Sequence, residues 1–199
     1  MAEGDTASYA TTLVQRLAID GRSAQGSLAR MTSSDRAGAL LAAADALRRD
    51  ESAILSANAA DVAEGEAAGL SAAMVDRLRL DPDRLAGIAD AVAAVARLAD
   101  PVGEVISRDE RPNGLVMERV RIPIGLIGII YESRPNVTAD AAALCVRAGN
   151  AVILRGGSEA VRSNAAIHAA MVRGLERAGV PAAAVQLVPT QDRAAVGAM

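Results

Sequence analysis

Two short apolar segments, 126–131 and 151–154, constrain the fold of this chain more than any other feature. Both are rich in isoleucine and valine, both are bounded by turn residues, and both are too short to be core helices. Such runs are typical of strands that are buried in a parallel sheet with both faces covered. We therefore expect two buried parallel strands here and a third strand at 185–188.

The segment between the first two strands has the spacing of a helix, which we expect over 137–148. The apolar residues on one side of this helix are Ala141, Leu144, Cys145 and Ala148. Gly149 and Asn150 follow, and both residue types tolerate the left-handed conformation that ends many helices. This pattern predicts the α/β class, with a Rossmann-like parallel sheet.

The second strand leads through a glycine pair, Gly156-Gly157, into an expected helix over 160–178. A strand, a glycine turn and a helix N-terminus form an anion-binding corner at the carboxyl edge of a parallel sheet. A simpler interpretation is a tight turn in which Ser158 caps the helix and Glu159 complements its dipole. On spacing alone the simpler interpretation is the better supported one, because short motifs are weak evidence.

The rest of the chain divides into a helical part and a hairpin. Apolar residues recur at helical spacing in four segments, which are 8–19, 34–50, 51–65 and 82–99. After Pro101 the pattern alternates over 102–106 and 115–120, with a turn at 111–114. We expect three units: a helical part over 1–100, a β-hairpin over 101–121 and a truncated sheet core over 122–199.

Composition excludes several classes of protein. The net charge of −3 gives no basic field for nucleic acid, and no apolar run approaches the ~20 residues of a membrane span. All 21 basic residues are arginine, which excludes a Schiff-base lysine and a Walker phosphate loop. The acidic start lacks the apolar segment of a secretory signal, so we expect a cytoplasmic protein.

Two strings carry a family resemblance: GIIYESRPNVT at 128–138 and AGNAVILRGGSE at 148–159. With further matches upstream, they closely resemble γ-glutamyl phosphate reductase, also called glutamate-5-semialdehyde dehydrogenase, a divergent family of the aldehyde dehydrogenase superfamily. The resemblance extends from about residue 30 to residue 199. It implies NADPH-dependent reduction of L-glutamyl 5-phosphate to L-glutamate 5-semialdehyde in proline biosynthesis.

The resemblance also implies that this chain is an amino-terminal fragment without the catalytic domain. Members of the family are about twice as long, and their nucleophilic cysteine lies beyond residue 199. Three parallel strands would also leave an unfinished sheet edge, which natural proteins rarely expose. We therefore expect no turnover from this chain alone. The family further implies a homo-oligomer formed through the hairpin at 101–121 and channelling with glutamate 5-kinase.

The corner after the second strand is, by this resemblance, the cofactor site. The expected cofactor-binding residues are Arg155, Gly156, Gly157, Ser158 and Glu159. They would hold the adenosine ribose of the dinucleotide, with Glu159 the least certain member. An arginine suits a 2′-phosphate, because its planar fork makes charge-assisted bonds to phosphate oxygens. Arg155 therefore favours NADPH over NADH.

The loop after the first strand would carry the substrate side. In related enzymes an asparagine of this loop stabilises the oxyanion, and Asn136 is the nearest candidate. Ser133 and Arg134 are expected to bind substrate, Arg134 through the acyl phosphate or the carboxylate. The alternative is that Arg134 is an ordinary surface residue of the loop, and the sequence leaves both open.

The single cysteine and the single histidine are expected to be structural. Cys145 lies among apolar residues in its helix, where burial raises the pKa of a thiol and makes it inert. His168 lies at the border of the apolar face of helix 160–178 and has no second metal ligand nearby, so we expect no metal site.

One other function remains open. The chain is alternatively a non-catalytic module for dinucleotide binding or dimerisation. Another aldehyde dehydrogenase is disfavoured, because the strings at 132–136 and 155–157 depart from the commoner words of that superfamily.

Overall fold

A computed structural model describes residues 3–199, with side chains from Tyr9 onward. Its centre is a three-stranded parallel sheet in the order β3 (Leu126–Ile130), β4 (Ala151–Arg155) and β5 (Val185–Leu187). The register pairs Ile130 with Arg155, so β3 and β4 end side by side. The predicted α/β class and all three predicted strands are confirmed.

The expectation that both early strands are buried is wrong for β3. The middle strand, β4, is buried along its whole length, whereas Ile130 of β3 is 54% exposed. The reason is the strand order, because β3 has only β4 as a neighbour and forms an edge. An isoleucine-rich run therefore did not distinguish an edge strand from a central one.

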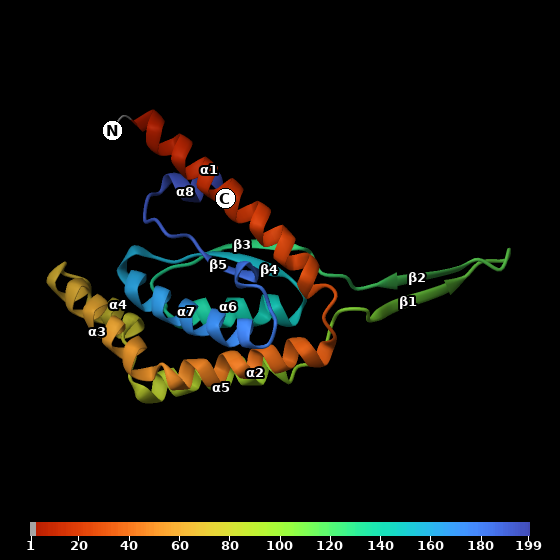
Figure 1. Ribbon diagram of the computed structural model, residues 1–199, viewed down its shortest axis with the longest axis horizontal. Helices are drawn as coiled ribbons and strands as arrows, with labels where there is room; N and C mark the ends of the chain where they lie inside the picture. Colours follow the sequence, from red (N-terminus) through yellow and green to blue (C-terminus); the bar gives the residue numbers. More distant parts are fainter. Residues whose placement is uncertain (1–2) are drawn as a thin grey trace.

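Helices cover both faces of the sheet (Figure 1). The long helix α1 (Glu3–Leu28) crosses one face, and α6 (Asn136–Arg147) and α7 (Val161–Arg177) cover the other. A further layer of α2 (Ser33–Arg49) and α5 (Pro82–Ala96) packs on α6 and α7. This burial of both faces is what a parallel sheet requires.

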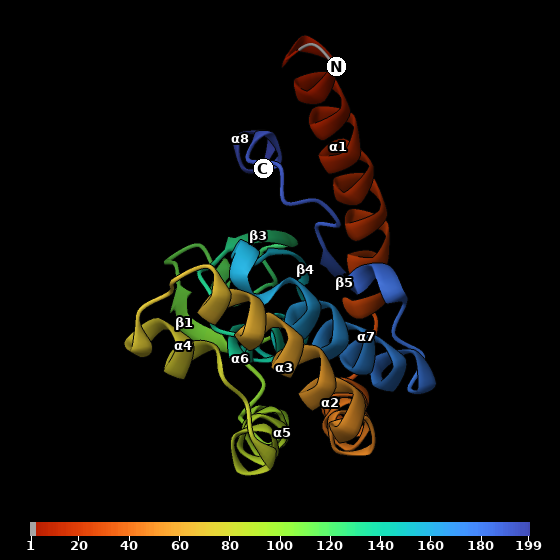
Figure 2. The same ribbon diagram turned by 90° about the vertical axis from the view of Figure 1, so that its left-hand side faces the viewer.

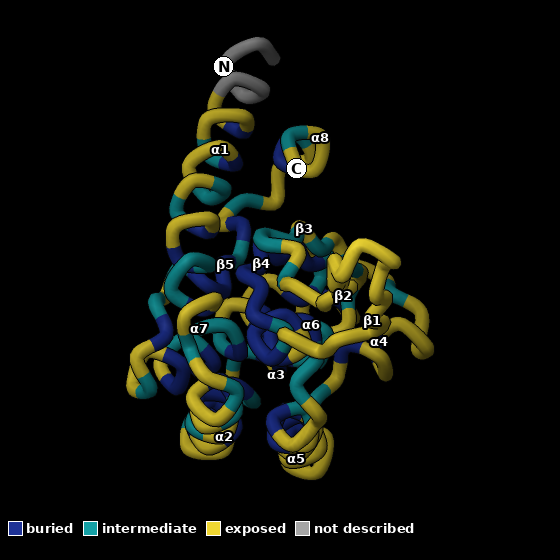
Figure 3. Tube along the Cα trace, turned by 90° about the vertical axis from the view of Figure 1, so that its right-hand side faces the viewer, coloured by how far each residue is buried: buried dark blue, intermediate teal, exposed yellow. Residues whose placement is uncertain are grey.

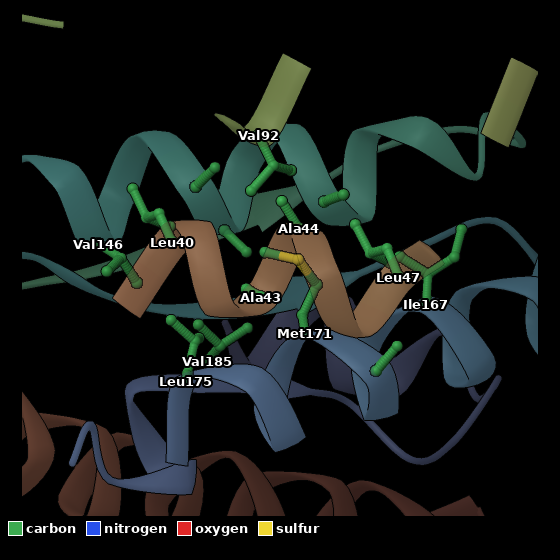
Figure 4. Close-up of a cluster of buried hydrophobic side chains, with 14 of the residues drawn as sticks. Leu40, Ala43, Ala44, Leu47, Val92, Val146, Ile167, Met171, Leu175 and Val185 are labelled. Carbon is green, nitrogen blue, oxygen red and sulfur yellow. The ribbon is translucent and has the colours of Figure 1, made fainter. Parts of the chain in front are cut away.

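The main core lies where α2 crosses α7, and Figure 4 shows the side chains that interlock there. Leu40 and Leu47 of α2 meet Ile167, Met171 and Leu175 of α7, all of them fully or almost fully buried. The remaining positions of this crossing are largely alanine, so the two backbones approach closely. Figure 3 shows the buried residues concentrated in the sheet and in the helix faces that meet it.

Helices α3 (Glu51–Ala67) and α4 (Ala72–Leu78) lie at the end of the sheet opposite to the hairpin (Figures 1 and 2). The turn after β4 contacts α3, so this end is the carboxyl end of the parallel strands. Helix α4 was not predicted. It has only seven residues, too few for a periodic pattern.

The expected hairpin is present and projects away from the body (Figure 1). Its strands are β1 (Val105–Glu110) and β2 (Val116–Val120), which pair antiparallel with every residue exposed. The first strand begins three residues later than expected, because Gly103 adopts a φ of 84° in a preceding turn. The role of this hairpin in oligomerisation stays a prediction.

Two helices differ from the expected pattern. Helix α1 continues past residue 19 to Leu28, and Gly21 within it lies against the sheet. A Cβ at Gly21 would lie 2.7 Å from the Leu126 side chain. In α6 the expected apolar side is wrong at Leu144, which is 53% exposed, while Ala142 and Val146 are buried instead.

None of the helices within residues 3–199 has the length and apolarity of a membrane span. The acidic start, from which we expected no secretory signal, begins with residues 1–2, which lie outside the described residues.

Candidate functional site

A cavity of about 550 Å³ opens at the carboxyl end of the sheet. Its walls are the loop 131–134 after β3, the turn 155–159 after β4, helix α4 and the segment 191–196 after β5. Six of the predicted site residues line it together: Ser133, Arg134, Arg155, Gly157, Ser158 and Glu159. Parallel strands bring the loops that follow them to one edge, which explains this clustering.

The two glycines of the turn are needed for space and not for a left-handed backbone. Neither has a positive φ. A Cβ on Gly156 would lie 2.2 Å from Asn164 Nδ2 and 3.0 Å from the Tyr131 hydroxyl. A Cβ on Gly157 would lie 2.7 Å from Ser133 Oγ. The turn therefore packs directly against the loop after β3.

Behind the turn, a polar chain connects β3, α6 and α7. The Tyr131 hydroxyl lies 2.7 Å from Thr138 Oγ1, which donates to Asn164 Oδ1 at 3.0 Å. Thr138 and Asn164 are almost completely buried. Burial raises the pKa of Tyr131, so its hydroxyl stays protonated. This chain fixes the floor on which Gly156 lies.

Ser158 does not cap α7, which corrects the simpler interpretation of the turn. Residues Ser158–Ala160 form a short 3-10 turn, and α7 begins only at Val161. The cap comes from α3, where Asp61 accepts hydrogen bonds from the backbone amides of Arg162 (3.3 Å) and Ser163 (2.7 Å). Ser158 is thereby left exposed at the cavity.

Glu159 and Ser133 join the two loops of the site. The Ser133 hydroxyl donates a hydrogen bond to the Glu159 carboxylate. This bond, together with the Glu159 backbone amide, lowers the pKa of Glu159 below its ordinary value. The carboxylate is therefore ionised at neutral pH and accepts hydrogen bonds. Such a group suits the hydroxyls of a ribose.

Arg155 is part of the frame of the site. Its side chain is only 8% exposed, and its guanidinium donates to the carbonyls of Gly156 and Gln191, the latter at 2.9 Å. Its Nε is buried and has no hydrogen-bond partner among the described residues. Arg155 thus connects the end of β4 to the segment after β5, with little freedom to follow a ligand.

Asn136 is not brought into this cavity. It is the first residue of α6, and its Nδ2 donates to Asp140 Oδ2 at 2.9 Å. Both residues line a neighbouring cavity of about 390 Å³. Burial raises the pKa of Asp140, and the bond from Asn136 opposes this shift. Asn136 as an oxyanion donor stays a prediction.

Cys145 and His168 lie away from the cavity. Cys145 is 6% exposed within the core, and burial raises the pKa of its thiol to about 11. His168 Nε2 donates to the carbonyl of Val185 at 2.9 Å, and burial lowers the pKa of the imidazole. Both residues therefore have structural surroundings, as the sequence predicted.

Cys145 should react slowly with thiol reagents in the folded chain. The thiolate is the nucleophile. At pH 8 the thiolate fraction of a thiol with a pKa of about 11 is roughly two orders of magnitude smaller than that of an ordinary cysteine. We expect iodoacetamide to modify the native chain at least ~100-fold more slowly than the unfolded chain. Cys145→Ala gives the background. Equal rates for native and unfolded chain would contradict the buried position.

Sequence reasoning missed the cavity residues that come from other segments. Met74 and Arg77 of α4 line it, as do Gln191, Arg193 and Val196. Their positions follow from the packing of α4 and of the segment after β5, and no local motif marks them.

Comparison with known proteins gives consistent results. The model of the aldehyde dehydrogenase family matches residues 4–199. Over 193 residues the chain is 72% identical to gamma-glutamyl phosphate reductase of Novosphingobium aromaticivorans. This alignment covers 97% of this chain and 45% of that protein. Over 190 residues it is 64% identical to the gamma-glutamyl phosphate reductase of Sphingopyxis alaskensis.

Solved structures show the same likeness. The crystal structure of gamma-glutamyl phosphate reductase from Thermotoga maritima aligns with a TM-score of 0.89 at 40% identity, over 92% of this chain and 44% of that one. The corresponding Saccharomyces cerevisiae structure aligns with a TM-score of 0.85 at 33% identity, over 91% and 47%. The chain thus spans a little less than half the length of these relatives.

Proposed function

The chain belongs to the aldehyde dehydrogenase family, and we propose that it forms the dinucleotide-binding part of an NADPH-dependent γ-glutamyl phosphate reductase. The reaction transfers a hydride to the acyl carbon of L-glutamyl 5-phosphate and releases phosphate, which gives L-glutamate 5-semialdehyde for proline biosynthesis. The 72% identity to a reductase of that name carries the proposal. The whole protein would act in the cytoplasm.

The lining of the cavity supports dinucleotide binding. Gly157 and Ser158 line it, and the ionised Glu159 offers an acceptor to ribose hydroxyls. The guanidinium groups around the cavity suit phosphates. When bound, the nicotinamide would supply the hydride. Residues 155–159 would hold and orient the adenosine side, and the arginines would favour NADPH over NADH.

The substrate would bind beside the cofactor. Ser133 and Arg134 line the same cavity as the cofactor turn, and Arg134 would hold the acyl phosphate or the carboxylate of L-glutamyl 5-phosphate. Asn136 would serve as oxyanion donor. Its side-chain amide would then give up its hydrogen bond to Asp140 and donate to the substrate oxygen instead. The nucleophile would be a cysteine other than Cys145.

The second candidate function is a non-catalytic dinucleotide-binding or dimerisation module. It is favoured by the burial of Cys145, because a buried thiol cannot serve as the nucleophile. The hairpin supports the dimerisation part. It exposes Val105, Ile106, Val116 and Val120, and a two-stranded hairpin alone is marginally stable. Homo-oligomer formation and channelling with glutamate 5-kinase are proposals for the whole protein.

Calorimetric titration with NADPH and NADH tests the proposal. We expect the chain to bind dinucleotide, and Arg155→Met to weaken binding by roughly tenfold, because each charge-assisted bond that holds the turn contributes about 1.5–3 kcal/mol. Thermal unfolding of both proteins separates weaker binding from lost folding. A folded wild-type chain that binds neither dinucleotide would overturn the proposal.

Both functions predict that this chain alone has no turnover. The chain alone should not reduce L-glutamyl 5-phosphate, since its single thiol is buried and protonated. Turnover that disappears in Cys145→Ala would contradict this assignment of roles.

A further inference from the structure

Arg77 reaches the cavity from α4, an element outside the predicted site. One face of this helix, with Met74 and Arg77, lines the cavity. An adjacent face buries Val75 and Leu78 in a small apolar cluster with Ala160, the last residue of the short 3-10 turn before α7. Helix α4 therefore shares an apolar cluster with the residue that directly follows the predicted cofactor turn 155–159.

Polar bonds fix α4 in this position. Asn58 of α3 is almost completely buried; it donates to the Leu78 carbonyl at 2.8 Å and accepts from the Leu80 amide at 2.7 Å. The same side chain donates to Ser163 Oγ at the start of α7 at 3.0 Å. Asn58 therefore ties Leu78, the neighbour of Arg77, to the start of the helix that follows the cofactor turn.

The charges around the cavity are unbalanced. Four arginines line it against only two glutamates, although the chain as a whole carries a net charge of −3. The guanidinium of Arg155 is committed to backbone carbonyls. Among the described side chains, which begin at Tyr9, those of Arg77, Arg134 and Arg193 have no hydrogen-bond or ion-pair partner.

The neighbours of Arg77 behave differently. Arg79 pairs with Glu66 at 2.9 Å, and Arg84 pairs with Asp76 at 2.8 Å. Glu66 lies on α3 and Asp76 on α4 itself, so acidic partners are available around this segment. Arg77 instead directs its charge to the cavity, where a phosphate would accept two parallel bonds from its fork.

We propose that Arg77, with Arg134 and Arg193, forms a phosphate-binding wall of this cavity, and that Arg155 positions the turn instead of contacting the phosphate. The inference rests on the proposed function and deepens it. The phosphate is either the 2′-phosphate of NADPH or the acyl phosphate of the substrate. Arg77 also lines the neighbouring cavity that holds Asn136, so it stands between the two predicted subsites.

The test compares Arg77→Gln and Arg193→Gln with Arg177→Gln, an equal charge change on an exposed arginine in the last turn of α7. Calorimetry measures the Kd of NADPH, NADH and inorganic phosphate for each variant. We expect Arg77→Gln to weaken binding of a phosphate-bearing probe by roughly tenfold to a hundredfold, and Arg177→Gln to leave it unchanged. Arg77→Lys keeps the charge but lacks the planar guanidinium fork, so its affinity for the phosphate-bearing probe should lie between those of the wild type and Arg77→Gln.

The pattern of losses identifies the phosphate. A loss of the preference for NADPH over NADH in Arg77→Gln supports the 2′-phosphate. Weaker binding of inorganic phosphate with an unchanged preference for NADPH supports the substrate phosphate. Unchanged affinity for every probe in a folded Arg77→Gln would overturn the inference. It would leave the proposed function intact, provided that the wild type binds dinucleotide.

Discussion

Replacing Gly174 with alanine is expected to destabilise the chain by about 3 kcal/mol or more, the upper end of the range for overpacked cores. Gly174 lies on α7 where it crosses α2. A Cβ there would lie 2.4 Å from Ala43 Cα and 2.6 Å from the Ala42 carbonyl oxygen. Both obstacles are backbone atoms, so no side chain can rotate away and the two helices must separate. The melting temperature should fall by roughly 6–12 °C.

Gly38→Ala is the matched control for this change. Gly38 lies within α2 itself, and a Cβ there meets nothing within 4 Å. Alanine in an open helical position should stabilise the chain by roughly 0.5–1 kcal/mol. Urea unfolding of the two variants therefore gives shifts of opposite sign. If Gly174→Ala were as stable as the wild type, the close crossing of α2 and α7 would be wrong.

Asp61→Ala should lower the free energy of unfolding by about 3–5 kcal/mol, which is the range for removing one partner from a buried charged network. The Asp61 carboxylate accepts from two backbone amides of α7, from the Ser163 hydroxyl at 2.7 Å and from the Arg162 guanidinium at 3.1 Å. No side chain of α7 itself caps its first turn. Removing Asp61 therefore leaves buried donors without partners and loosens the start of α7, directly after the cofactor turn.

Asp45→Ala provides the comparison for this variant. Asp45 pairs with Arg48 on the exposed face of α2, where a single ion pair contributes less than about 1 kcal/mol. Denaturant unfolding should separate the two aspartates clearly, and amide hydrogen exchange at 158–163 should accelerate only in Asp61→Ala. A cost for Asp61→Ala as small as that for Asp45→Ala would contradict its role as the cap of α7.

The sheet could be predicted from sequence because it follows from local patterns of apolar runs and turn residues. The family resemblance named Ser133 and Glu159 as site residues, and the rule that parallel strands end at one edge explains why they meet. The local apolar pattern correctly gave Cys145 a buried position. Each of these features depends on residues close in sequence or on one topological rule.

Features that depend on packing between distant segments could not be predicted. The cap of α7 comes from Asp61, about a hundred residues earlier in the chain, and Arg77 reaches the cavity only because Asn58 holds α4 in place. The first helix was expected over 8–19 but continues to Leu28, and the missing side chain of Gly21 makes room for Leu126. In the same way, Leu144 fitted the helical period but faces outward, because α6 buries its alanines instead.

Amide chemical shifts of the ¹⁵N-labelled chain during titration with NADPH test the central claim most directly. The proposed site predicts that the largest changes fall on the turn 155–159, with smaller ones at Ser133 and Arg77, and that the hairpin 105–120 stays unchanged. Shifts confined to residues outside the cavity, or no shifts in a folded chain at saturating NADPH, would contradict the assignment of the dinucleotide site.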